Sequence, residues 1–253
     1  MRKFLFVSIA ASATLLTACT SHYQLTGVSR TRILIDKTYD AQPDAAASAF
    51  LAPYKHQVDS IMGPVVGEVA HDMAANRPES DLSNLLTDIF IYMAKNYGES
   101  PDFAVYNMGG IRSALSKGKV TYGDVLDVAP FENKICFLTL TGKDVMELFS
   151  QIAMRGGEGV SKGVQLVITE DGRLLSVRLH GKEIDPQANY RITTIDYLAQ
   201  GNDGLSAFKN GTNLNLPKDE KNNARYVIRD YFLEMMQKGI VVDSKVEGRI
   251  VIR

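Results

Sequence analysis

The stretch NMGGIR, residues 107–112, stands directly after the apolar run DFAVY at 102–106. The apolar run predicts a buried strand, so the chain places an amide, two glycines and an arginine where a strand ends. Two glycines let a ligand approach the backbone closely. Arg112 offers a planar, permanently charged fork that suits a phosphate, a carboxylate or an aromatic face. The stretch indicates a ligand site, although it also fits a strand-ending turn with a solvent-facing arginine.

Two further stretches have the same character. APFENK supplies Phe131 and Asn133 just before a strand-like run, and DYLAQGNDG supplies Tyr197 and Asp203 just after another. Two aromatic rings from separate loops could stack on either side of a flat ring, and a carboxylate beside them could accept a hydrogen bond from a sugar hydroxyl. Each stretch also fits a turn with a packed aromatic. Taken together, a flat ring, a sugar and an anion describe a nucleotide.

Apolar periodicity predicts that helices and strands interleave along the chain. Asp171-Gly172 lies between two alternating runs, which predicts a hairpin. A hairpin among interleaved elements indicates one α/β (α+β) domain, in which a mixed β-sheet is packed by helices. Helices are predicted over 43–62, 80–98, 121–130, 141–157 and 223–239, and strands over 32–36, 65–70, 102–106, 134–140, 190–195 and 248–253, with the hairpin over 164–184.

The first residues indicate export. MRKFLFVSIAASATLLTAC has two cations and an apolar run, which is typical of a signal peptide. Its ending, Leu-Thr-Ala-Cys, resembles the lipobox of bacterial lipoproteins and so implies cleavage before Cys19 and lipidation of that residue; the alternative is a plain secretory signal. We expect a lipoprotein signal peptide over 1–18, a tether over 19–31 and one domain over 32–253, lipid-anchored to a bacterial envelope membrane on its periplasmic or cell-surface side.

The sequence shows no complete catalytic apparatus. The net charge of −1 gives no reason to expect a nucleic-acid partner. The four histidines do not form a clustered ligand set, and no metalloprotease, serine-hydrolase or P-loop motif is present. The dipeptide His71-Asp72 fits a capping or surface role better than a metal site. Cys136 alternates within a strand-like run and is predicted to be a buried thiol. No catalytic residue and no metal ligand is therefore assigned.

Several ordered motifs together resemble one known family. NMGGIR, TYGDVLDVAPFENKI, LTLTGKDVMELF and GKEIDPQANYRITTIDYLAQGNDG resemble the C-terminal domain of the 5'-nucleotidase family, which includes UDP-sugar hydrolases. The resemblance runs from about Val65 to the final GRIVIR. In such enzymes an N-terminal metallophosphatase domain holds two metals and performs hydrolysis, and the C-terminal domain binds the nucleoside. The resemblance therefore implies the corresponding fold and a nucleoside site in this chain.

The resemblance also implies a role for each matching residue. Phe131 and Tyr197 correspond to the two aromatics that sandwich the base, with Tyr197 replacing the usual Phe. Asp203 corresponds to the ribose-binding acid. Asn133 corresponds to the amide after the first aromatic, and Arg77 corresponds only loosely to an upstream arginine. The implied substrate-binding set is Arg77, Asn107, Gly109, Gly110, Arg112, Phe131, Asn133, Tyr197 and Asp203.

The roughly 40 residues between the lipobox and the start of the match are fewer than the 50–250 of a typical domain. The expected function is therefore the nucleotide-binding half of a split 5'-nucleotidase. No cofactor is expected in this chain, and divalent metals are expected in a separate metallophosphatase chain. One alternative is a stand-alone nucleoside- or nucleotide-binding lipoprotein without catalysis. Another is an independent hydrolase in which carboxylates alone hold Mg²⁺.

Overall fold

The structure is a computed structural model that describes residues 23–41 and 43–253. The chain divides into two units after Phe50. The predicted signal peptide, residues 1–18, and the predicted lipidation site, Cys19, lie outside the described residues. None of the helices in the described residues is both long and apolar enough to cross a membrane.

The first unit contains the 3₁₀ turn η1 (Lys37–Tyr39). The strand predicted at 32–36 is wrong, because these residues are coil followed by a bend, and Ile33, Leu34 and Ile35 are exposed. A short apolar run forms a strand only where a neighbouring strand satisfies its backbone groups. The three consecutive apolar residues of this segment were therefore a weak predictor.

Helix α2 (Ala45–Met62) begins in the first unit and continues into the second. The carboxylate of Asp44 accepts hydrogen bonds from the backbone N–H groups of Ala46 and Ala47, at 2.9 and 3.0 Å. The helix predicted from the apolar period is confirmed, but it buries none of its residues. The spacing of the apolar residues thus predicted the helix correctly, but it did not predict whether those residues are buried.

The largest sheet of the second unit has the strand order β10-β4-β9-β2-β5. Strand β9 pairs antiparallel with β4 on one side and parallel with β2 on the other. The carboxyl ends of β9 and β2 therefore lie at the same sheet edge as the amino end of β4. The bounds are β2 (Phe103–Tyr106), β4 (Ile135–Thr141), β5 (Gly159–Val160), β9 (Asn189–Ile195) and β10 (Thr212–Asn215).

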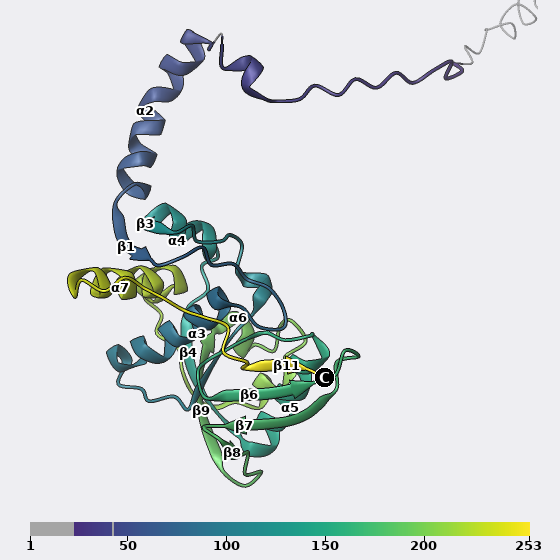
Figure 1. The fold of residues 1–253 in the computed structure, drawn as a ribbon, viewed down its shortest axis with the longest axis vertical. Helices are drawn as coiled ribbons and strands as arrows, with labels where there is room; N and C mark the ends of the chain where they lie inside the picture. Colours follow the sequence, from purple (N-terminus) through teal and green to yellow (C-terminus); the bar gives the residue numbers. More distant parts are fainter. Residues whose placement is uncertain (1–22, 42) are drawn as a thin grey trace, which may run out of the picture. The chain divides into compact units, whose positions relative to one another are not determined.

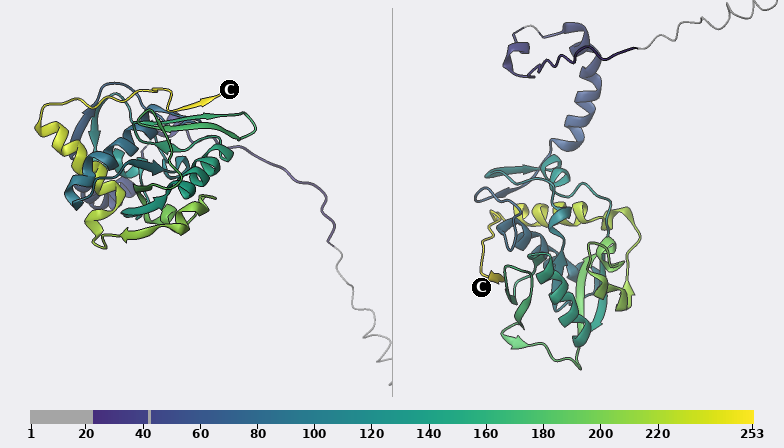
Figure 2. Two further views of the ribbon diagram at one scale, coloured as in Figure 1. Left: turned by 90° about the horizontal axis from the view of Figure 1, so that it is seen from below. Right: turned by 90° about the vertical axis from the view of Figure 1, so that its right-hand side faces the viewer.

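A second sheet, of order β11-β6-β7-β8, contains the end of the chain. Strand β11 pairs parallel with β6 at the edge of this sheet (Figures 1 and 2). The predicted hairpin is confirmed between β6 and β7, with Gly172 in the left-handed region at φ +82°. Strands β1 and β3 form a separate antiparallel pair. The bounds are β1 (Val65–Val69), β3 (Gly118–Thr121), β6 (Val164–Ile168), β7 (Leu174–Leu179), β8 (Lys182–Glu183) and β11 (Ile250–Ile252).

Four longer helices of the second unit pack against these sheets, as predicted. Helix α3 contacts β2 and β5, and α5 contacts β4 and β9 of one sheet and β7 of the other. Helix α7 packs against β1, α3 and α4 (Figure 1). Thr121 and Asp124 form a capping box at the start of α4. The bounds are α3 (Asp81–Met93), α4 (Tyr122–Val128), α5 (Gly142–Met154), α6 (Asp196–Ala199) and α7 (Ala224–Gln237), with 3₁₀ turns η2 (Ala94–Tyr97), η3 (Met108–Gly110), η4 (Ser206–Asn210) and η5 (Glu220–Asn222).

The predicted fold class, mixed sheets packed by helices, is confirmed. Aromatic side chains join the layers of the core: the rings of Phe103 on β2 and Phe149 on α5 have centroids 5.2 Å apart. Cys136 is fully buried, as predicted. Burial raises the pKa of its thiol to about 12, so this cysteine is an unreactive core residue. Strands β3 (GKVT), β5 (GV) and β10 (TNLN) were not predicted, because they are short and carry only one apolar residue each.

Candidate nucleotide-binding site

A pocket of about 240 Å³ lies where β2, β9 and β4 share a sheet edge. The turn after β2, the segment before β4 and the segment after β9 all reach it, because the strand order places these three chain segments side by side. Seven of the nine predicted site residues meet here. The lining residues are Asn107, Gly109, Gly110, Phe131, Asn133, Tyr197 and Asp203.

The carboxylate of Asp203 is the most constrained group in the pocket. Its Oδ1 accepts a hydrogen bond from the hydroxyl of Tyr197 at 2.9 Å, and its Oδ2 accepts one from Nδ2 of Asn107 at 2.7 Å. Nη2 of Arg155 lies 3.8 Å from Oδ2. The residue itself has φ +54°, in the left-handed region that Asp tolerates better than most residues. A carboxylate has about four lone-pair sites, so these contacts orient it and leave acceptor capacity for a ligand.

The predicted glycine motif forms the turn η3 beside this carboxylate. Its two glycines are needed for different reasons. A side chain on Gly109 would lie 3.9 Å from both Asn107 Nδ2 and Asp203 Oδ2, so it would extend into the polar end of the pocket. A side chain on Gly110 would lie 2.7 Å from Asn107 Oδ1, a buried oxygen with no hydrogen-bond partner. Gly109 keeps the pocket open, and Gly110 makes room for the asparagine.

The two predicted aromatics both face the pocket, and each is held by a polar contact. Phe131 is 46% exposed, and its loop is held by Arg225 on α7. The guanidinium of Arg225 donates to the carbonyl oxygen of Pro130 and to the carboxylate of Glu132, both at 3.1 Å. The hydrogen bond from Tyr197 to Asp203 raises the pKa of the tyrosine hydroxyl. This bond fixes the position of the Tyr197 ring.

The two predicted arginines lie outside the pocket lining. Arg112 is exposed, and its Nη1 donates to the carbonyl oxygen of Gly109 at 3.3 Å, so it lies next to the glycine turn. Arg77 is bound elsewhere: its Nε donates to the carbonyl oxygen of Gly157 at 2.8 Å, and its Nη2 pairs with Glu158 at 2.5 Å. Both arginines are exposed, but Arg77 is paired with a buried acid, whereas Arg112 bonds to a backbone carbonyl oxygen beside the pocket.

Two charged residues beside the site, Arg155 and Glu158, were missed by sequence reasoning. They lie in the segment MRGGEG, where the paired glycines indicated only the end of a helix. The structure adds that Glu158 is completely buried and that Arg155 reaches Asp203. An acid directly before β5, among glycines and apolar residues, was the available signal.

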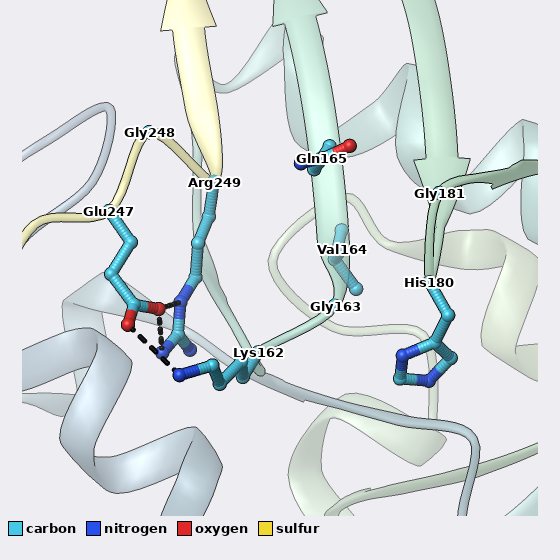
Figure 3. Close-up of a pocket in the computed structure, with 9 residues that line it drawn as sticks. All are labelled: Lys162, Gly163, Val164, Gln165, His180, Gly181, Glu247, Gly248 and Arg249. Atoms are coloured by element: carbon cyan, nitrogen blue, oxygen red, sulfur yellow. Dashed lines mark hydrogen bonds and ion pairs between the residues drawn. The ribbon is translucent and has the colours of Figure 1, made fainter.

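A larger cavity of about 660 Å³ lies apart from these residues, between the start of β6 and the start of β11 (Figure 3). Its buried cation, Arg249, already pairs with Asp88 at 2.6 Å and with Glu247 at 2.9 Å. Lys162 also bonds to Glu247, at 3.3 Å (Figure 3). Because both cations are paired, this cavity has little uncompensated charge with which to hold an anion.

Two of the histidines contact polar groups of the fold and not other candidate metal ligands in a cluster. His71 lies 3.5 Å from Asp243, and His180 lies 3.2 Å from the carbonyl oxygen of Asp102. Over residues 23–41 and 43–253, no three His, Cys, Asp or Glu side chains gather as a metal site.

The fold and the pocket define an α/β domain with a small-molecule site at one edge of a mixed sheet. The chain belongs to the family described as "5'-nucleotidase, C-terminal domain", whose model matches residues 65–210, more than half of the chain. The expected family is therefore confirmed.

Relatives support the same assignment. The chain is 35% identical over 165 residues to Endonuclease YhcR of Bacillus subtilis, covering 62% of this chain and 13% of that protein. It is 28% identical over 182 residues to a 5'-nucleotidase of Vibrio vulnificus, covering 68% and 32%. The solved 5'-nucleotidase precursor from Thermus thermophilus superposes with a TM-score of 0.71 at 26% identity, covering 84% of this chain and 44% of that chain. The chain spans under a third of the length of these two curated relatives.

Proposed function

We propose that this chain is the nucleotide-binding part of a 5'-nucleotidase system, which binds the nucleoside portion of its ligand and presents the phosphate to a separate metallophosphatase chain. The observation that carries the proposal is that Phe131, Tyr197 and Asp203 line one pocket. A flat ring between two aromatics and a hydroxylated sugar on a carboxylate are the two recognition elements that a nucleoside requires.

Each lining residue has a distinct role in this proposal. Phe131 and Tyr197 stack on the base, and Asn133 bonds to its edge. Asp203 accepts from the ribose hydroxyls. Asn107 also belongs to the implied substrate-binding set, but its Nδ2 donates to Asp203. We therefore assign Asn107 to holding the ribose-binding carboxylate.

The size of the pocket supports a phosphate that stays outside it. Its volume of about 240 Å³ is below the roughly 300–1,000 Å³ of pockets that enclose drug-sized ligands. The base and sugar occupy the pocket, and the phosphate projects from its mouth. Arg112, which is exposed beside the glycine turn, complements that anion.

Calorimetric titration of adenosine and AMP tests the binding role. Each base–aromatic contact is worth roughly 1–3 kcal/mol, so Phe131→Ala should lower affinity by about one to two powers of ten. Losing one ring collapses the sandwich, so the double variant with Tyr197→Ala should show coupling. If the single variants fold well and bind as the wild type does, or the wild type binds no nucleoside, the assignment of this site is overturned.

A phosphate-release assay tests the division of labour. In the proposal, the divalent metals and the attacking water belong to the partner. The purified chain should release negligible phosphate from AMP with added divalent metals, and adding a candidate metallophosphatase should restore release. Turnover by the isolated chain that survives removal of contaminating phosphatases contradicts the proposal. Nucleoside binding that no metallophosphatase converts into turnover would instead support a binding lipoprotein.

We also propose that Cys19 carries a lipid that anchors the chain to an envelope membrane, outside the cytoplasm. The support is the lipobox-like ending of the N-terminal stretch. Replacing Cys19 by Ser should release the protein from the membrane fraction and abolish labelling with a fatty acid. A variant that still sediments with membranes and still takes up the label would show that the anchor lies elsewhere.

A further inference from the structure

Glu158 is a charged residue with no exposed surface, next to a pocket whose lining does not include it. Burying a carboxylate is unfavourable unless it is paired and hydrogen-bonded. Here Oε1 accepts from Nη2 of Arg77 and Nε of Arg155, each at 2.5 Å, and Oε2 accepts from the backbone N–H of Met108. Two of these partners connect it to the nucleoside pocket: Met108 lies in the turn η3, and Arg155 reaches Asp203.

The two oxygens connect different parts of the site. Met108 is the first residue of the turn η3, and Asn107 directly precedes it. By accepting from the N–H of Met108, Oε2 holds this glycine turn in place. Arg155, bound by Oε1 through Nε, extends its Nη2 to 3.8 Å from Oδ2 of Asp203. Along this path the charges alternate in sign: Arg77, Glu158, Arg155 and Asp203.

Glu158 and Asp203 therefore compete for one guanidinium. The contact between Arg155 and Glu158 is a hydrogen bond at 2.5 Å, whereas that between Arg155 and Asp203, at 3.8 Å, is too long to be one. Without the charge on Glu158, the favoured partner for Arg155 would be Asp203, because a charge-assisted bond between guanidinium and carboxylate is stronger than one to a neutral amide. That bond would occupy the lone pairs that a sugar hydroxyl needs.

We propose that Glu158 is a positioning residue that sets the sugar selectivity of the pocket by keeping Arg155 off the carboxylate of Asp203. The inference rests on the proposed function, since it concerns the ribose end of the same site. It adds a specificity determinant that the nucleoside does not touch. It also gives the buried acid a role that packing alone would not require, because apolar residues of similar size can replace a buried ion pair without loss of stability.

The test is the ratio of the affinities for adenosine and 2',3'-dideoxyadenosine, measured by calorimetric titration of the full chain. The wild type should prefer adenosine by roughly fivefold or more, as expected for a hydrogen bond to a charged acceptor. In E158Q the ratio should fall towards one, while binding of the dideoxy analogue changes by less than about twofold because the aromatic clamp remains. Adding R155M to E158Q should restore the preference, because the competing cation is gone.

A purely structural role predicts a different pattern. In that case E158Q would weaken both nucleosides equally, and R155M would weaken them further instead of restoring the preference. The matched control is E99Q, which removes the acid of the Arg191–Glu99 pair, at 2.6 Å, near the opposite end of β9 from Tyr197. That variant should lose stability and keep the wild-type ratio.

The outcomes separate this inference from the proposed function. If E158Q does not fold, R155M alone provides the test: Arg155 is 31% exposed, and its removal should raise the preference for adenosine. A wild-type ratio retained in E158Q, or a preference lost in R155M, would overturn the inference and leave nucleoside binding intact. A wild type that binds both nucleosides equally would also overturn it. A wild type that binds neither nucleoside overturns the proposed function, and the inference with it.

Discussion

At the scale of single residues, the pocket is organised around the carboxylate of Asp203. Tyr197 and Asn107 donate to its two oxygens, and Gly109 leaves the space in front of it open. Sequence motifs suggested all four residues, but only the structure shows that three of them bond to one another. The polar end of the pocket is thus already hydrogen-bonded in the absence of a ligand.

The two adjacent glycines should respond differently to the same substitution. Gly110→Ala would press a methyl group against the buried Asn107 and should destabilise the fold by roughly 1–3 kcal/mol, as overpacking usually does. Gly109→Ala meets only van der Waals contacts at 3.9 Å, so the protein should fold normally and bind adenosine more weakly. Thermal melting and calorimetric titration of both variants distinguish the two effects. Equal melting temperatures with equal affinities would show that neither glycine has the assigned role.

Tyr197→Phe separates the ring of Tyr197 from its hydroxyl. The ring should still stack on the base, so affinity for 2',3'-dideoxyadenosine should stay at the wild-type value. Loss of the hydrogen bond to Asp203 frees that carboxylate to move, and adenosine binding should weaken by roughly 0.5–1.5 kcal/mol. Titrations with both nucleosides measure the difference. A loss that is equal for the two ligands would place the effect in the ring and not in the hydroxyl.

At the scale of elements, the pocket depends on how strands pair and on a helix distant in sequence. Apolar and β-branched residues in short runs predicted β2, β4 and β9. Their order could not be predicted, since local pattern carries no information about which strand pairs with which. The same limit explains the missed contacts of Glu158 with Met108 and Arg77, which are 50 and 81 residues away in the chain. Arg225 was missed for the same reason: it appeared to be one more polar residue of an amphipathic helix.

Arg225→Met should loosen the loop that presents Phe131. The variant keeps most of the buried stem and loses the hydrogen bonds to Pro130 and Glu132. We expect adenosine affinity to fall by about 1 kcal/mol, roughly fivefold, with little loss of stability. Faster amide hydrogen exchange at residues 131–134, together with titration, measures the effect. Arg229→Met is the matched control, because Arg229 lies one turn further along α7 and pairs with Asp230. Unchanged exchange in Arg225→Met would mean that the loop holds its own shape.

At the scale of the second unit, α7 near the end of the chain packs against α3, which comes early in the unit. Glu234 on α7 accepts hydrogen bonds from Tyr92 on α3, from Lys95 on η2 and from Lys238 after α7, at 2.6, 3.0 and 2.7 Å. The contacts to Tyr92 and Lys95 span 142 and 139 residues of sequence. They join the helix that supports β2 to the helix that holds the Phe131 loop, so both sides of the pocket depend on this packing.

This cluster should make stability depend on acid. Donation from Lys238, Tyr92 and Lys95 lowers the pKa of Glu234 from 4.5 to about 2. A lowered pKa in the folded state stabilises the protein above the unfolded pKa of about 4.5, and the stabilisation is lost as pH falls towards 2. Because solvent screens this surface cluster, Glu234→Gln should cost at most about 1 kcal/mol at pH 7. Urea unfolding at pH 7 and pH 3 should show the difference shrinking on acidification. Glu170→Gln, at an exposed glutamate, controls for the change in net charge.

The buried acid at position 158 has a consequence for how this site varies among related sequences. A lone carboxylate at that depth is unfavourable, and two neighbouring guanidinium groups without it would repel each other. We therefore expect positions 77, 155 and 158 to covary. Relatives with an apolar residue in place of Glu158 should lack at least one of the two arginines, and relatives that retain the acid should retain both. Independent variation at the three positions would show that evolution does not treat them as one unit.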